Sequence, residues 1–155
     1  MKFTQILKSW GPVALWLALI FFDSTDVMSS AHTSRFLVPI LHWLKPDISP
    51  WTVLRINLLV RKAAHVTEYA ILTGLFFLAL RPSIAGFWRR AAVALVPALL
   101  LAPLDEFHQS FVPSRSASPV DVLIDYAGAI LGILICRALY LLLTARAAKA
   151  ARTSP

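Results

Sequence analysis

Most of the side chains that could do chemistry lie in three short segments, each with the spacing of one helix face. Residues 61–69 (RKAAHVTEY) place guanidinium, imidazole, carboxylate and phenol groups at positions i, i+4, i+7 and i+8. Residues 105–109 (DEFHQ) hold two carboxylates within about one turn of a histidine and a glutamine, and Asp121 and Asp125 stand four residues apart. Such groups can transfer protons and hold anions or cations.

The formal charges of these segments do not balance. Five carboxylates accompany three permanent cations, which leaves two negative charges over. Protonation of His65 and His108, a proton shared by two carboxylates, or a divalent cation would each close this difference. The carboxylates are Glu68, Asp105, Glu106, Asp121 and Asp125, and the cations are Arg61, Lys62 and Arg115.

In a catalytic version of the site, His65 or Glu106 would act as the general acid or base. Asp105 and Asp121 would orient that group or hold a cation. The candidate catalytic residues are His65, Glu68, Asp105, Glu106 and Asp121.

In a binding version, Arg115 and Lys62 would hold a phosphate or a carboxylate. Three other interpretations stay open: a polar clamp between helices, a hard-metal site built from two i, i+3 pairs, and a serine nucleophile from the loop at 114–118. The candidate substrate-binding residues are Arg61, Lys62, Tyr69, Gln109, Arg115 and Asp125.

The elements that position these groups are predicted to be membrane helices. Hydrophobic residues make up 58% of the 155 residues and charged ones 15%, with a mean hydropathy of +0.70. A soluble domain carries about 25% charged residues, and a chain this small cannot bury so many apolar ones. Neither a soluble globular enzyme nor a disordered chain fits this composition. The single Cys136 excludes an intrachain disulfide. The net charge is +7, but the basic residues are not interleaved with aromatic ones in the pattern typical of nucleic-acid binding.

The fold class is therefore all-α, a polytopic membrane protein with one domain over residues 1–155. Two apolar stretches, 36–44 and 51–60, are too short to cross a bilayer, so we expect interfacial or re-entrant helices in a first outer loop. Whether residues 36–60 re-enter the membrane stays open. Four spans are expected at about 6–22, 63–80, 88–104 and 120–143, followed by a basic tail at 144–155.

Two features inside the spans predict departures from plain helix packing. Pro97 and Pro103 predict a kink or a break in the third span. Gly128 and Gly132 stand four apart in the fourth span, a pattern that lets two helices approach closely.

The distribution of charge predicts the orientation. With the N-terminus inside, the inner segments hold nine of the fifteen basic residues and none of the eight acids. Cytoplasmic segments of membrane proteins carry such an excess of Lys and Arg. Both termini are therefore expected in the cytoplasm, and the polar residues are expected on the outer face.

Three blocks of the sequence resemble the VanZ-like membrane protein family, whose named member is associated with teicoplanin resistance. They are RKAAHVTEYAIL at 61–72, DEFHQSFVPSR at 105–115, and the run that carries Asp121, Asp125, Gly128 and Gly132. FFDSTDVMSS, after the first span, is similar to the family's polar serine segment. The resemblance implies a bacterial inner-membrane protein of about four helices that is linked to the cell envelope. The recurrent motif positions that it implies are Lys62, His65, Tyr69, Asp105, Glu106, Gln109, Arg115 and Asp121, and asparagine replaces Asp125 in some relatives.

The resemblance brings no settled reaction, so enzymatic activity stays open. The leading hypothesis is an envelope protein whose outward-facing pocket binds, and in one version processes, an anionic lipid-linked or cell-wall substrate, with a role in glycopeptide resistance. The alternative is a non-catalytic accessory protein that alters envelope surface composition. An ion conduit is disfavoured because the inner halves of the spans lack acids and histidines. The expected partners are the lipid bilayer and that substrate, with no nucleic acid; the cofactor is unknown, with a divalent cation as one option, and the oligomeric state stays open.

Overall fold

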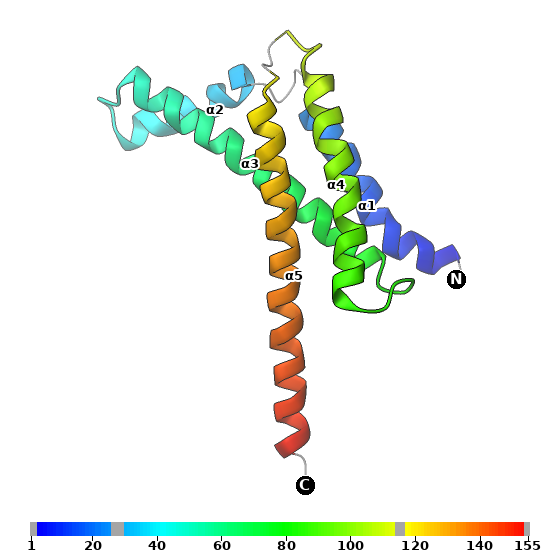
Figure 1. Cartoon of the computed structure of the whole chain (residues 1–155). Coiled ribbons are helices and arrows are strands. Elements are labelled where there is room, and N and C mark those ends of the chain that lie inside the picture. The colour runs from blue at the N-terminus through cyan, green and yellow to red at the C-terminus, as the bar shows by residue number, and fades with distance from the viewer. Residues whose placement is uncertain (1–2, 26–29, 114–116, 154–155) are drawn as a thin grey trace.

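The computed structural model describes residues 3–25, 30–113 and 117–153, and all regular structure in these ranges is helical. Figure 1 shows α3 crossing the long α5, with α4 and α1 on the side of α5 where α3 ends. This arrangement confirms the all-α prediction. The helices are α1 (Phe3–Asp23), α2 (Ser30–Leu44), α3 (Pro50–Ala79), α4 (Phe87–Gln109) and α5 (Pro119–Thr153).

Three of these helices are long and apolar enough to cross a membrane: Phe3–Asp23, Phe87–Gln109 and the Pro119–Ala151 part of α5. Their outward faces carry many exposed leucine, isoleucine, valine and phenylalanine side chains. Such surfaces suit contact with lipid tails, because exposing so much apolar area to water is unfavourable.

The second predicted span differs most from the structure. The sequence suggested a separate short piece at 51–60 and a span from about 63, but α3 runs without interruption from Pro50 to Ala79. Ser49 caps its start by accepting a hydrogen bond from the Thr52 backbone N–H at 3.2 Å, and Pro50 occupies the first helical turn. Polar residues such as Arg55 reduce hydropathy without breaking a helix, so hydropathy alone misplaced the boundary.

The closest helix packing is between α3 and α5, along Gly128 and Gly132. A Cβ built on Gly128 would lie 2.5 Å from the carbonyl oxygen of Val66, and one on Gly132 would clash with the carbonyl oxygen of Ala70. The close approach expected from this glycine pair is therefore present. Gly128 meets Val66, and Gly132, one turn later on α5, meets Ala70, one turn later on α3. The helices α3 and α5 therefore run in the same direction.

The helix α4 packs through small residues and continues through both of its internal prolines. Its buried face carries Ala91, Ala94, Ala98 and Ala102, and the same face ends in two buried polar side chains, Glu106 and Gln109. The two prolines do not break α4, which is one helix from Phe87 to Gln109. The kink that they also allow stays a prediction.

One proline is compensated by a neighbouring helix. Pro103 has no N–H to donate to the carbonyl oxygen of Leu99, four residues earlier. The hydroxyl of Tyr126 on α5 donates to that oxygen at 3.1 Å. The carbonyl released by the proline therefore has a partner, and α4 is tied to α5 at this level.

The helix α1 packs antiparallel to α3. Trp10 contacts Phe76 with ring centroids 6.1 Å apart, and Trp16 donates its indole N–H to the main-chain oxygen of Glu68 at 2.9 Å. Ile20 enters the core with Tyr69 and other buried residues. As a result, the C-terminal end of α1 reaches the level of α3 that holds the candidate site.

Candidate functional site

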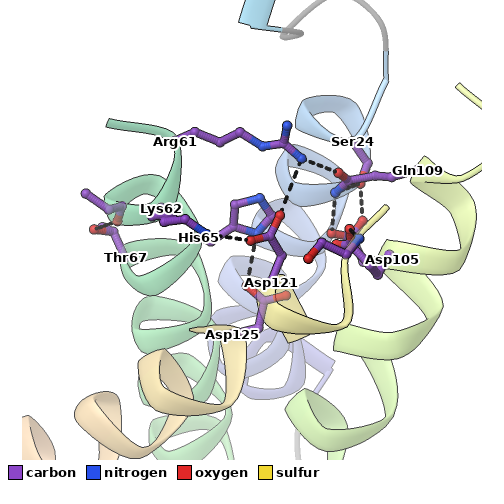
Figure 2. Close-up of polar contacts among 12 residues, drawn as sticks. Ser24, Arg61, Lys62, His65, Thr67, Asp105, Gln109, Asp121 and Asp125 are labelled. Carbon is purple, nitrogen blue, oxygen red and sulfur yellow. Dashed lines mark hydrogen bonds and ion pairs between the residues drawn. The ribbon is translucent and has the colours of Figure 1, made fainter. Parts of the chain in front are cut away.

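Polar side chains from α3, α4 and α5, and from Ser24 just after α1, meet at one end of the bundle, near the C-terminal ends of α1 and α4 and the N-terminal end of α5. Figure 2 shows Arg61, His65, Asp121 and Asp125 pointing toward one another, with Ser24, Asp105 and Gln109 grouped beside them. We call this set the polar cluster. It consists of Ser24, Arg61, Lys62, His65, Asp105, Glu106, Gln109, Asp121 and Asp125.

The innermost pair is His65 and Asp125. Nδ1 of His65 lies 3.0 Å from Oδ1 of Asp125, and the two residues are 3% and 0% exposed. The side-chain ligand atoms of His65, Asp105 and Asp125 lie within 4.8 Å of one another. Helices α3, α4 and α5 thus each bring one group capable of binding a cation to the same point.

Two cations converge on Asp121 at the start of α5. Lys62 Nζ donates to its Oδ1 at 3.0 Å, and Arg61 lies 3.7 Å from its Oδ2. Arg61 also donates to Oε1 of Gln109 at 3.3 Å. These contacts tie α3 to both α5 and α4, and they neutralise the Asp121 carboxylate.

Gln109 connects the outer part of the cluster to α1. It is 2% exposed, and its Nε2 donates to Asp105 Oδ2 at 3.0 Å and to Ser24 Oγ at 3.3 Å. Ser24 in turn donates to Oδ1 of Asp105. Both oxygens of Asp105 are therefore hydrogen-bonded, although by neutral groups.

Glu106 has a partner that the spacing did not predict. Its Oε1 accepts the backbone N–H of Ser118 at 2.6 Å, just before α5 begins. A carboxylate at a helix N-terminus also interacts favourably with the helix dipole. Its Oε2 is buried without a hydrogen-bond partner among the described residues.

The remaining candidates lie around this centre or outside the described ranges. Tyr69 is fully buried, and its hydroxyl has no hydrogen-bond partner in the described part of the chain. Glu68 is half-buried on α3. His108 stacks near Phe21, with ring centroids 5.1 Å apart. Arg115 lies outside the described residues.

An apolar cavity of about 230 Å³ adjoins the polar cluster. Leucine, isoleucine and phenylalanine side chains form most of its wall, and three polar residues of the candidate region complete it. Its lining residues are Leu17, Ile20, Phe21, Tyr69, Leu72, Leu101, Leu104, Asp105 and His108. The cavity therefore lies between α1, α3 and α4, with polar groups in its wall.

The sequence matches the VanZ/LLP1 family over residues 10–142, which is most of the chain and includes all the residues of the polar cluster. The chain belongs to the VanZ/LLP1 family. No curated protein and no solved structure matches it. The family assignment that the sequence blocks suggested is therefore confirmed.

Two contributors to this VanZ/LLP1 site were not among the candidates chosen from the sequence. Ser24 bonds both Asp105 and Gln109, and the indole of Trp16 anchors the main chain at Glu68. Ser24 lies in the FFDSTDVMSS segment, which was noted only for its resemblance to the family. A serine and a tryptophan give no distinctive spacing of their own, so only the packing of α1 against α3 and α4 identifies them.

Proposed function

We propose that this VanZ/LLP1 protein is a single multi-pass domain of the bacterial inner membrane that binds an anionic lipid-linked or cell-wall substrate at its polar cluster. In this proposal α3 is a fourth crossing helix, both termini are cytoplasmic, and the polar cluster faces outward. The charge distribution supports the orientation, since the end of the bundle opposite the cluster carries basic residues such as Lys8, Arg81 and Arg90. Residues 30–60 would lie at the outer surface.

The observation that carries the proposal is the contact between the apolar cavity and the polar cluster. Asp105 belongs to both, and Tyr69 and His108 lie in the cavity wall. A cavity between membrane helices can receive an apolar chain directly from the bilayer. A substrate with an apolar tail and a charged group would place its tail there and its charged group at the cluster.

The substrate's anionic group would be held by the cations of α3. The Nε of Arg61 is buried and has no hydrogen-bond partner among the described residues, so its N–H would gain one from an anion bound within the cluster. Lys62 has a partly exposed side chain beside it. Guanidinium and ammonium groups are suited to phosphate and carboxylate recognition.

The proposal is tested by binding a polyprenyl phosphate to the purified protein in detergent, monitored by native mass spectrometry. The uncharged polyprenol serves as the comparison ligand. We expect the phosphate to bind at least about tenfold more tightly, and we expect Arg61→Gln to remove most of that difference. Equal binding of both ligands to the wild-type protein would contradict the role assigned to the cations.

The role of the cavity is tested separately by filling it. Leu101→Trp places a large side chain in the wall of the cavity, whereas Leu139→Trp enlarges an exposed residue of α5. We expect only Leu101→Trp to weaken binding of both the phosphate and the alcohol. If the two variants bind alike, the tail does not occupy this cavity.

A non-catalytic accessory role is the second candidate function. It is favoured by the hydrogen bonds that already occupy Asp105, Gln109 and Asp121, which is typical of a structural network. Such a protein would alter envelope surface composition, and glycopeptide resistance with it, without converting a substrate. Recovery of the bound polyprenyl phosphate unchanged after prolonged incubation would favour this role over processing.

A further inference from the structure

The point where His65, Asp105 and Asp125 meet has the composition of a metal site. One imidazole and two carboxylates, from three different helices, have their ligand atoms within 4.8 Å of one another. Nitrogen and oxygen ligands of this kind suit divalent transition metals. Two ligand atoms that each lie about 2.0–2.1 Å from a tetrahedral zinc ion are about 3.4 Å from one another. The distances between these ligand atoms would therefore have to shorten by about 1.5 Å or less to form such a site.

Unpartnered polar atoms give a second and independent sign of a ligand. Nε2 of His65 and Oδ2 of Asp125 are buried and have no hydrogen-bond partner among the described residues. Both residues are more than nine-tenths buried. Buried polar groups normally have partners, because leaving one unpaired costs about 1–3 kcal/mol. An ion ligated by Nε2 of His65 or by Oδ2 of Asp125 would supply the interaction that this atom lacks.

The balance of charge also favours a divalent ion. The two described cations of the polar cluster, Arg61 and Lys62, both contact Asp121. Asp125 contacts His65, and Asp105 contacts the neutral side chains of Ser24 and Gln109. A divalent cation with a neutral imidazole and two carboxylates has no net charge, which lowers the free energy of holding these acids at membrane depth.

We propose that His65, Asp105 and Asp125 bind a divalent transition-metal ion between α3, α4 and α5. The ion would lie beside the apolar cavity, since Asp105 also lines that cavity. This inference deepens the proposed function and rests on it for the identity of a substrate. Metal binding itself is measured without any lipid, so the two proposals can fail separately.

The experiment uses the full-length protein purified in detergent, treated with a chelator and dialysed. Zn²⁺ is then titrated by calorimetry, with Mn²⁺ as a second probe, and bound metal is counted by elemental analysis. We expect one equivalent to bind to the wild-type protein. Asp105→Asn and Asp125→Asn should each lower the affinity by about 100-fold or more, because each removes a charged ligand.

The matched controls are Asp47→Asn and His42→Gln, which change exposed residues of the same types. Both should bind like the wild-type protein, and Zn²⁺ should raise the thermal midpoint of the wild-type protein and of both controls. Should Asp125→Asn fail to fold, the half-buried Asp105 and the wild-type titration still decide the result.

Two results would overturn the metal proposal. One is a wild-type protein that binds neither Zn²⁺ nor Mn²⁺ stoichiometrically. The other is a folded Asp105→Asn variant with wild-type affinity, which would place the ion elsewhere. The first result would leave His65 and Asp125 as a polar clamp between α3 and α5.

Discussion

Asp121 and Glu106 illustrate two different uses of a carboxylate at the same end of the bundle. Asp121 is neutralised by Lys62 and Arg61. Glu106 has no cation within ion-pair distance among the described residues, and it accepts a backbone N–H instead. For such a carboxylate, a substitution that keeps the accepting oxygen and removes only the charge separates the contribution of the hydrogen bond from that of the charge.

Glu106→Gln should therefore be milder than Glu106→Ala. Glutamine keeps an oxygen that accepts the Ser118 N–H and loses only the favourable interaction with the start of α5, about 0.3–1 kcal/mol. Alanine leaves the N–H of the half-buried Ser118 without this acceptor, which costs up to about 1–3 kcal/mol. Unfolding in mixed detergent and denaturant, with the exposed Asp47→Ala as the control, measures both. Equal losses for the two variants would show that the charge matters and the acceptor does not.

At the residue scale, the sequence identified the reactive side chains better than it identified the residues that they contact. Helical spacing within single segments brought His65, Asp105 and Asp125 into consideration, because i and i+4 positions share a face. It could not tell that Glu106 faces the start of α5 or that Ser24 joins Asp105. Those contacts depend on how separate helices are placed, which no spacing within a segment encodes.

At the scale of the elements, the glycine contact between α3 and α5 makes a sharp prediction. Gly128→Ala should destabilise the protein by about 1–3 kcal/mol, because its Cβ would lie 2.5 Å from the Val66 carbonyl oxygen and a backbone must move. Gly74→Ala is the matched control, since its Cβ would meet only Cys136 Sγ at 3.9 Å. That control should change stability little or raise it, as alanine favours helix.

The outcome that would contradict this packing is a Gly128→Ala variant as stable as Gly74→Ala. Both variants are compared by thermal unfolding in the same detergent. The lost stability should be accompanied by weaker metal binding if His65 and Asp125 move apart with the helices.

The hydrogen bond from Tyr126 to α4 is tested by a double-mutant cycle. Tyr126→Phe should lower the free energy of unfolding by about 0.5–1.5 kcal/mol. In a Pro103→Ala background, the restored N–H of residue 103 can serve the Leu99 carbonyl oxygen, so the same change should cost less. Identical losses in both backgrounds would mean that the two donors do not share this acceptor.

The helices themselves were partly predictable. Apolar runs located α1, α4 and α5, because helices that face lipid must be apolar over their full length. The same measure divided α3 at its polar first half, between Pro50 and Arg61. Hydropathy depends on how polar the side chains are and not on backbone conformation. One helix with a polar half and an apolar half is therefore predicted as two separate segments.

At the scale of the whole molecule, the two ends of the bundle differ in charge, and this predicts its orientation in the membrane. Ser110, at the end of α4 near the polar cluster, and Ser83, in the turn between α3 and α4, are both exposed. In a Cys136→Ala background, Ser110→Cys should react with a membrane-impermeant maleimide in intact spheroplasts. Ser83→Cys should react only after permeabilisation. The reverse pattern would invert the proposed topology.

Because α3 and α5 run in the same direction, the chain must first return to the starting level of α3 through α4 before α5 can pack against α3. His65 leaves the ribosome 60 residues before its partner Asp125, and Gly128 and Gly132 follow later still. During synthesis, α3 therefore has to wait with its imidazole unpaired while the next helix is made. The site is complete only once α5 has been made, because α5 carries Asp121 and Asp125. In the proposed topology, a nascent chain that stops short of α5 would present unpaired polar groups within the bilayer, a mark by which membrane quality control could distinguish it from a chain that contains α5.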